Sequence, residues 1–155
     1  MYMDKSIKNY YKKISSIMIK DHLKLLSLLY EFDLSLKNHL DLQIKTFNIF
    51  YNNLKKHFET EDEVLFSSFT EKEFESKNFI NKLLKQHKEI INEVEKISYN
   101  INNNLGLDAL KLRDLLNEHL EFEEKFVYNK LDKIIDSSKT NELLNKLSDQ
   151  LGLLY

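Results

Sequence analysis

Four histidines and two glutamates are the residues of this 155-residue chain whose spacing could support joint chemistry. Two of the histidines stand four residues before a glutamate, in His57-Phe-Glu-Thr-Glu61 and in His119-Leu-Glu-Phe-Glu123. Residues four apart share one face of a helix, so each pair would point in one direction. Imidazole nitrogen and carboxylate oxygen together suit iron, manganese or zinc. The candidate metal ligands are His22, His57, Glu61, His87, His119 and Glu123.

Long amphipathic segments must position these residues. The spacing of apolar side chains predicts helices over Ile14–Lys37, Leu40–Phe69, Phe74–Asn102 and Asp108–Ile135, and a shorter one over Thr140–Leu154. Breaks are expected near 37–39, 70–72, 102–106 and 136–139, and residues 1–13 are expected to form a helical extension or an arm. Short connections between long helices favour antiparallel neighbours. The predicted fold class is therefore all-α, an up-down-up-down four-helix bundle with a short additional C-terminal helix, in a single domain over residues 1–155.

The four histidines fall one on each long segment, within its apolar stripe. Each lies roughly 14–19 residues from the centre of a neighbouring break, so at about 1.5 Å of rise per residue all four reach one level of the bundle. A lone histidine in an apolar stripe is most often a hydrogen-bonded core residue. Four unrelated core histidines have no reason to share a layer, whereas metal ligands must.

The order of the ligands repeats along the chain. A histidine followed by an H-x-x-x-E motif occurs twice, and corresponding histidines of the two halves are 65 and 62 residues apart. This pattern predicts an internal duplication and two metal ions related by a pseudo-twofold axis. With Glu61 and Glu123 as shared bridges, each ion would have two histidines and two carboxylate oxygens. An oxo or hydroxo bridge would bring each ion to five ligands and leave one position for O2, NO, peroxide or water.

Composition excludes several other classes of protein. The chain has no cysteine, no proline and only two glycines, which excludes disulfide scaffolds, zinc–thiolate and iron–sulfur sites, and glycine-rich phosphate loops. The net charge of -2, from 23 basic and 25 acidic residues, gives no footprint for nucleic acid or an anionic membrane. The sequence shows neither the apolar region of a signal peptide nor a run long enough to span a membrane. We therefore expect a cytoplasmic location.

A family resemblance rests on four sequence motifs. They are Lys20-Asp21-His22-Leu23, Leu54-Lys55-Lys56-His57 through Glu61-Asp62-Glu63, Lys85-Gln86-His87-Lys88, and Glu118-His119 through Glu123-Glu124. Together they cover about residues 14–135 and resemble the hemerythrin-like HHE cation-binding family. The resemblance implies a bundle that holds two non-haem iron ions with an oxo or hydroxo bridge and carboxylate bridges. It makes His22, His57, His87 and His119 terminal ligands, and Glu61 and Glu123 the bridges.

The chain departs from the oxygen-carrying members of that family. These have H-x-x-x-H on the third helix, whereas the positions four away from His87 are Leu83 and Ile91. The pattern is more similar to the H-HxxxE-H-HxxxE branch, which includes di-iron proteins of iron–sulfur-centre repair and hemerythrin-like proteins with catalase-type activity. Repair proteins commonly carry a cysteine-bearing N-terminal module, and this chain has no cysteine.

The function expected from these observations is a non-haem di-iron protein that binds or reacts with a small oxidant, O2, NO or peroxide. Its role would lie in sensing or in protection against oxidative or nitrosative stress. Three alternatives stay open: a catalase-like or other redox enzyme, an iron donor for iron–sulfur cluster repair, and a helical interaction bundle without metal. The expected partner is the small oxidant, with no nucleic acid and no membrane, and the fifth segment could mediate a homodimer.

The remaining histidine and three tyrosines are assigned simpler roles. His39 stands near an expected turn and is interpreted as a surface or helix-start residue. Tyr30, Tyr51 and Tyr128 could line a pocket, but core packing is the preferred interpretation. Metal-binding imidazoles also need partners for their second ring nitrogen. The sequence does not identify these partners.

Overall fold

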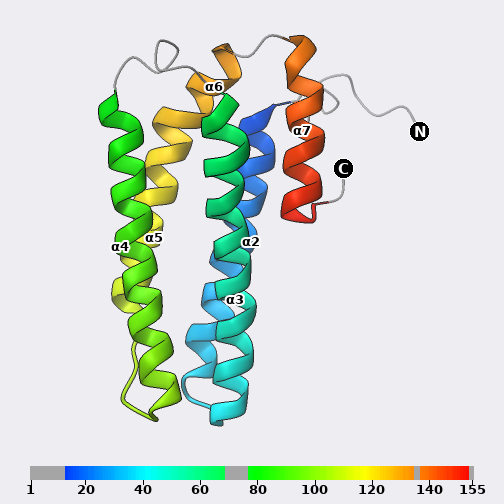
Figure 1. The fold of residues 1–155 in the computed structure, drawn as a ribbon. Coiled ribbons are helices and arrows are strands. Elements are labelled where there is room, and N and C mark those ends of the chain that lie inside the picture. Colours follow the sequence, from blue (N-terminus) through cyan, green and yellow to red (C-terminus); the bar gives the residue numbers. More distant parts are fainter. Residues whose placement is uncertain (1–12, 69–76, 135–136, 154–155) are drawn as a thin grey trace, which may run out of the picture.

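The computed structural model of the chain describes residues 13–68, 77–134 and 137–153. Within these ranges every regular element is helical, as the scarcity of glycine and proline predicts. Four rods run side by side in alternating directions: α2 (Ile14–Ser35), α3 (Leu40–Thr60), α4 (Lys77–Asn102) and α5 (Leu110–Phe122) (Figure 1). Two shorter helices, α6 (Tyr128–Ile134) and α7 (Ser137–Leu151), lie at one end. The predicted all-α bundle is confirmed.

Two of the predicted helices contain local changes of helical type. The segment expected over 40–69 is α3 followed by a π-helical turn, η1 (Glu61–Leu65), and a 3-10 turn, η2 (Phe66–Ser68). The segment expected over 108–135 is α5, a second π-helical turn, η3 (Glu123–Val127), and α6. The arm or extension expected over residues 1–12 and the break expected near 70–72 lie outside the described residues.

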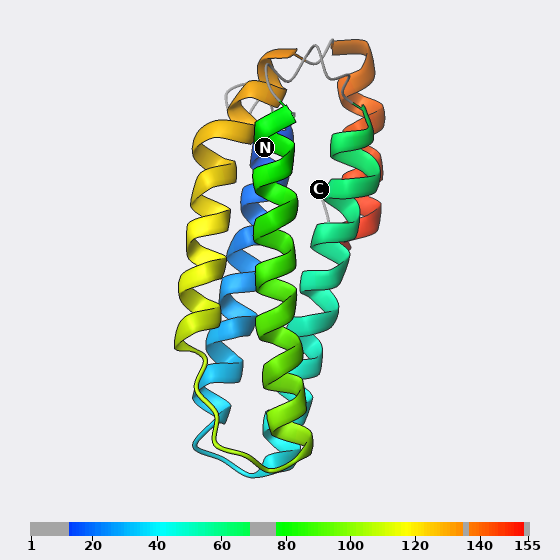
Figure 2. The ribbon, with the colours of Figure 1, turned by 60° about the vertical axis from the view of Figure 1, so that its left-hand side comes forward.

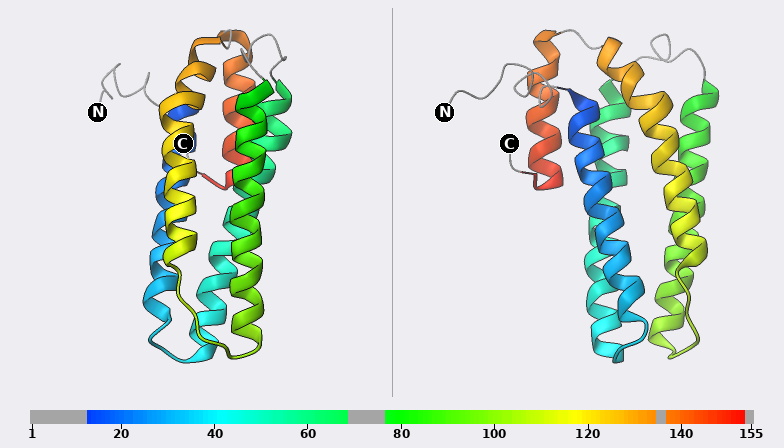
Figure 3. Two further views of the ribbon diagram at one scale, coloured as in Figure 1. Left: turned by 90° about the vertical axis from the view of Figure 1, so that its left-hand side faces the viewer. Right: turned by 180° about the vertical axis from the view of Figure 1, so that it is seen from behind.

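The connections and the last helix complete the arrangement. Figure 2 shows the turn after α2 and the longer connection after α4 at the same end of the bundle. At the opposite end α7 packs against α2, α3 and η1, outside the four-rod bundle (Figure 3). It begins three residues before the Thr140 expected from the sequence. No helix in the described ranges combines the length and the apolarity of a membrane span.

The predicted turn near 102–106 ends α4 through a left-handed residue. Asn104 has a φ of 52°, and asparagine accepts this conformation more readily than most side chains do. The backbone N–H of Leu105 donates to the carbonyl of Asn100 at 2.9 Å, and that of Asn104 donates to Ile101 at 3.1 Å. This bonding pattern satisfies the last carbonyls of α4 and stops the helix.

The apolar core is divided into two clusters along the bundle. The upper cluster lies at the end that carries α6 and α7, and the lower cluster fills the rest of the bundle. The upper cluster includes Met18, Leu65, Leu83, Val127, Leu131 and Leu147. The lower cluster includes Leu25, Phe32, Phe50, Leu54, Ile90, Leu112 and Leu116. Along α2, His22 stands between Met18 of the upper and Leu25 of the lower cluster, so a polar layer separates the two.

Candidate metal centre

The polar layer brings together all six side chains that the sequence singles out. They form two overlapping groups that share Glu61 and Glu123: one adds His22 and His57, the other His87 and His119. In each group one nitrogen or oxygen atom per residue lies within 4.8 Å of the others. We call the six residues the ligand cluster, and its two sides the His22/His57 half and the His87/His119 half. The predicted equal height of the four histidines is confirmed.

Burial of the ligand cluster is nearly complete. Five of its members are at most 1% exposed, and His87 is 6% exposed. Buried carboxylates are costly unless a cation or hydrogen bonds compensate them. The fifth histidine of the chain, His39, is exposed at the residue before α3, as interpreted from the sequence.

The two glutamates reach both halves of the cluster. Glu61 Oε1 lies 3.6 Å from His57 Nε2, while its Oε2 lies 3.2 Å from His87 Nε2. Glu123 Oε2 lies 3.3 Å from His22 Nε2, while its Oε1 lies 3.2 Å from His119 Nε2. Each carboxylate therefore directs one oxygen atom to each half.

A π-helical turn begins at each of these glutamates. The backbone N–H of Phe66 donates to the carbonyl of Glu61, and that of Tyr128 donates to the carbonyl of Glu123, both across five residues. Such turns insert a residue into an α-helix and are frequent at functional sites. They bring the residue five positions after each glutamate over that glutamate, which an ordinary α-helix does not do. The repeat seen in the sequence thus extends to the backbone.

Residues just before two histidines hold the imidazoles of neighbouring helices. Nδ1 of His57 lies 2.8 Å from Asp21 Oδ2, and Nδ1 of His119 lies 3.2 Å from Gln86 Oε1. An acceptor on Nδ1 places the ring proton there, so Nε2 presents its lone pair to the cluster. Asp21 is itself 1% exposed and also pairs with Lys24 Nζ at 3.1 Å. These are the imidazole partners that the sequence did not identify.

Residues just after the two glutamates face the other two histidines. Nδ1 of His22 lies 2.7 Å from Glu124 Oε1, which again leaves Nε2 directed into the cluster. The corresponding contact in the His87/His119 half is longer, since Nδ1 of His87 lies 3.7 Å from Asp62 Oδ1. The His22/His57 half therefore has a carboxylate on each imidazole, and the His87/His119 half has an amide and a distant carboxylate.

Unpartnered atoms test whether the cluster fits a metal ion. Nε2 of His57, His87 and His119, Oε2 of Glu61 and Oε1 of Glu123 are buried and have no hydrogen-bond partner among the described residues. Buried polar atoms are normally satisfied, so this concentration of lone pairs requires an explanation. All of these atoms point into the same cluster, and imidazole nitrogen with carboxylate oxygen is a metal-binding set. The residues present therefore fit a pair of metal ions.

The protonation of the cluster also shows an attraction for positive charge. Burial lowers the pKa of His57, but the charge of Glu61 and the hydrogen bond to Asp21 outweigh burial and raise the pKa well above the usual value. Burial, followed by the charge of Glu123, raises the pKa of Glu61. In the metal-free chain protons thus supply the positive charge that a metal cation would bring in their place.

The opposite half is electrostatically different. Burial lowers the pKa of His119 to about 3, so this imidazole is neutral at pH 7. Burial alone would raise the pKa of Glu123, but the nearby imidazoles, His119 first, hold it well below the usual range. Anionic carboxylate and neutral imidazole are the forms that bind metal.

Tyr128, which the sequence interpretation assigned to core packing, also contacts the ligand cluster. Its side chain is fully buried, but its Oη lies 2.5 Å from Glu61 Oε1 and 2.9 Å from Glu123 Oε2. Core packing is confirmed for Tyr128, which is fully buried in the upper cluster, and its hydroxyl also reaches the ligand cluster. Core packing was wrong for Tyr30, which is 62% exposed, whereas Tyr51 is half-buried against Phe47. The only sequence signal for this contact was that Tyr128 follows Glu123 by five residues. That spacing places the two residues together only if a π-helical turn lies between them.

An aromatic ring covers the His87/His119 half. Phe58 stacks on His87 with ring centroids 3.9 Å apart and an interplanar angle of 18°. It also contacts His119 edge-on, with centroids 5.5 Å apart. This half is thereby apolar on one side, and His87 is its most exposed ligand candidate.

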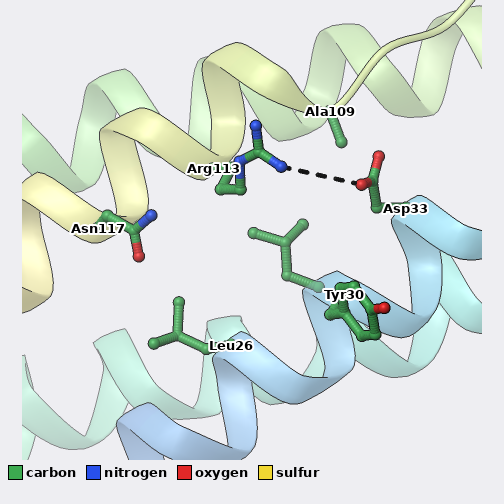
Figure 4. A pocket seen from close by; sticks show the side chains of 7 residues that line it. Leu26, Tyr30, Asp33, Ala109, Arg113 and Asn117 are labelled. Atoms are coloured by element: carbon green, nitrogen blue, oxygen red, sulfur yellow. Dashed lines mark ion pairs between the residues drawn. The ribbon is translucent and has the colours of Figure 1, made fainter.

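A groove of about 260 Å³ lies elsewhere, between α2 and α5 (Figure 4). Leu26 and Tyr30 line it from α2, and Asn117 lines it from α5. Arg113 Nη1 and Asp33 Oδ2 face each other across it at 4.0 Å. None of the six ligand-cluster residues lines this groove, so it is separate from the metal centre.

Comparisons with known proteins agree with the composition of the cluster. The family model described as hemerythrin HHE cation binding domain matches residues 13–131, which include all six cluster residues. No curated protein and no solved structure matches the chain in the corresponding comparisons.

Proposed function

The chain belongs to the hemerythrin HHE cation-binding domain family, and we propose on this basis that its ligand cluster holds two non-haem iron ions that bind or react with a small oxidant. The oxidant would be O2, NO or peroxide, and the role would be sensing or protection against oxidative or nitrosative stress. Family membership and the buried histidine–glutamate cluster support the metal-binding part of this proposal. The preference for iron and the identity of the oxidant are proposals that go beyond these two observations.

The observation that carries the proposal is the division of each carboxylate between the two halves. One oxygen of Glu61 faces His57 and the other faces His87, and Glu123 is divided in the same manner. A single metal ion would need the donors on one side only. Two ions that share both carboxylates would use every inward-facing donor of the cluster. We therefore assign the histidines as terminal ligands and the two glutamates as bridges.

The donor set and its surroundings favour iron. Thiolates are absent from the chain, which removes the usual ligands of structural zinc. Histidine–carboxylate sites with open positions are typical of non-haem iron that reacts with oxygen species. When bound, the iron pair would supply electrons to a small oxidant or accept them from it.

The chain itself supplies orientation and exclusion of water. Asp21, Gln86 and Glu124 accept from Nδ1 of three imidazoles and so hold each Nε2 inward. The upper and lower apolar clusters close the layer from above and below. Solvent comes closest at His87, beside the exposed Asp62. A small molecule would enter there, whereas a large substrate would not fit into a cluster that is otherwise at most 1% exposed.

Metal analysis combined with an absorption spectrum tests the proposal. The full chain, purified without chelators or loaded anaerobically with iron(II) and then exposed to air, should contain about two iron ions, as expected for two ligand groups. Oxo-to-iron(III) bands in the near ultraviolet should accompany the iron. Addition of NO to the reduced form, or of peroxide to either form, should change the spectrum.

Two comparisons make the experiment decisive. Loading with zinc or manganese at the same concentrations measures the preference for iron. Glu63→Gln changes an exposed glutamate next to the cluster and should leave metal content unchanged. A folded chain that takes up no iron would refute the proposal. Uptake of two zinc ions in preference to iron would retain the metal site but reject the redox function.

A further inference from the structure

The phenol of Tyr128 lies among the atoms of the ligand cluster. Its Oη is 2.5 Å from Glu61 Oε1, 2.9 Å from Glu123 Oε2 and 3.0 Å from His22 Nε2. The two glutamate oxygen atoms are the ones that face the His22/His57 half, and His22 belongs to that half. The hydroxyl has one proton, so it cannot donate to both carboxylates at once. A cation among these oxygen atoms would give the remaining carboxylate oxygen a partner as well.

The separations of 2.9 and 3.0 Å match those expected between ligands of one metal ion. Two donors each about 2.1 Å from a metal, at right angles to each other, are about 3 Å apart. The nitrogen–oxygen pairs of the cluster have comparable separations, such as 3.3 Å for His22 Nε2 to Glu123 Oε2. The phenol oxygen is at least as close to its neighbours as the assigned donors are to each other. It therefore occupies a ligand position by the same geometric measure.

The repeat provides an internal comparison. Tyr128 follows Glu123 by five residues, and the residue that follows Glu61 by five is Phe66. Both stand at the end of a π-helical turn, where their N–H groups close the five-residue hydrogen bond. Phe66 has no hydroxyl, so the first half of the sequence repeat, which contains Glu61, has no counterpart of the phenol oxygen. The two halves thus differ at a position where the backbone is the same.

From this geometry we infer that Tyr128 is an oxygen ligand of the metal ion in the His22/His57 half. The inference rests on the proposed di-iron function and adds a donor that the family's histidine–glutamate motif does not contain. Ligation exchanges the phenolic proton for the metal, and the proton passes to solvent. The oxidation state of the metal does not change in this exchange.

The inference makes the two halves of the centre unequal. The His22/His57 half then has five protein donors, namely two imidazoles, two carboxylate oxygens and the phenolate. The His87/His119 half has two imidazoles and two carboxylate oxygens. The half with fewer donors is also the one whose histidine is most exposed. An external small ligand is therefore directed to the His87/His119 half.

Resonance Raman spectroscopy of the iron(III) form tests the inference. Phenolate bound to iron(III) gives a visible charge-transfer band and enhanced tyrosine ring vibrations, neither of which histidine or carboxylate produces. The full wild-type chain should show both, and Tyr128→Phe should lose both while it retains iron. Tyr51→Phe makes the same chemical change at a half-buried tyrosine outside the cluster and should retain both signals.

The outcomes separate this inference from the proposed function. Wild-type protein with two iron ions and no enhanced tyrosine vibrations would overturn the role of Tyr128 and leave the di-iron proposal intact. Loss of the signals in Tyr51→Phe but not in Tyr128→Phe would also overturn it. A chain that binds no iron would overturn both. If Tyr128→Phe does not fold, wild-type protein containing ring-deuterated tyrosine keeps the inference falsifiable, because enhanced vibrations without an isotope shift would not come from a tyrosine and would overturn it.

Discussion

Asp21 accepts a hydrogen bond from Nδ1 of His57 across the interface of α2 and α3, at 2.8 Å and with both side chains at most 1% exposed. The residue directly before His87 repeats this relationship, since Gln86 accepts from Nδ1 of His119 at 3.2 Å. In both halves, therefore, the residue before one histidine holds the imidazole of the next helix, through a carboxylate in one half and a neutral amide in the other. A carboxylate makes the imidazole that it holds a stronger electron donor than an amide does.

We expect Asp21→Asn to weaken metal binding in the His22/His57 half. The amide oxygen can still accept from His57, so the ring keeps its orientation but loses the adjacent negative charge. Removal of such a partner typically lowers metal affinity by about 10–100-fold. Competition with a chelator should show one metal ion released more readily than in the wild type. Asp33→Asn changes a half-exposed aspartate of the same helix, away from the ligand cluster, and should leave the titration unchanged. Identical titrations for Asp21→Asn and wild type would show that the charge is irrelevant.

The sequence predicted the six cluster residues because their spacing follows ordinary α-helical geometry. The H-x-x-x-E pairs need only a face that repeats every three to four residues, and the equal heights need only a constant rise per residue. Asp21 could not be found in this way, because it acts on a neighbouring helix and the choice of neighbour depends on packing. Tyr128 was named only as a possible pocket residue, and its place in the ligand cluster could not be predicted because it reaches the cluster through a π-helical turn. Periodic patterns assume that such turns are absent.

The bridging assignment predicts different losses of metal for two conservative variants. Glu61→Gln removes one anionic oxygen from each half and should strongly reduce binding of both metal ions. His87→Gln removes a donor from one half and should leave about one metal ion per chain, in the His22/His57 half. Metal content after gel filtration checks both variants, with circular dichroism to verify folding. Loss of only one ion in Glu61→Gln would contradict a bridging carboxylate.

Metal removal should lower thermal stability. The cluster leaves several buried donors unpartnered in the metal-free chain, so a bound ion gains contacts in the folded state that the unfolded chain does not retain. At a free metal concentration 100 times the dissociation constant the gain is about 2.7 kcal/mol, which corresponds to roughly 5–10 °C in Tm for a chain of this length. Differential scanning calorimetry with metal and with chelator measures the shift. The same scans on His22→Ala should show a smaller one, and an equal shift would place the ion elsewhere.

The last helix should contribute to stability through the upper cluster. Leu147 of α7 is fully buried in the same apolar cluster as Leu65 and Leu131. Leu147→Ala should cost about 2–5 kcal/mol in the free energy of unfolding, which urea denaturation measures. Leu23→Ala removes a leucine that is 64% exposed and should change the free energy little. If both variants unfold at the wild-type urea concentration, α7 does not support the bundle in solution.

Glu61→Gln should have opposite effects on the metal-bound and metal-free proteins. Burial, followed by the charge of Glu123, raises the pKa of Glu61 in the folded state. A raised pKa means that ionisation of Glu61 disfavours folding, and this cost grows as the pH rises from the unfolded-state pKa to the folded-state pKa. In chelator at pH 7 the variant should therefore be more stable than the wild type, because glutamine carries no charge to bury. Below the unfolded-state pKa both states hold the proton, so the difference should disappear. Urea denaturation at pH 7 and pH 4 checks the sign. A variant that is less stable than the wild type at pH 7 in chelator would show that Glu61 stabilises the fold without metal.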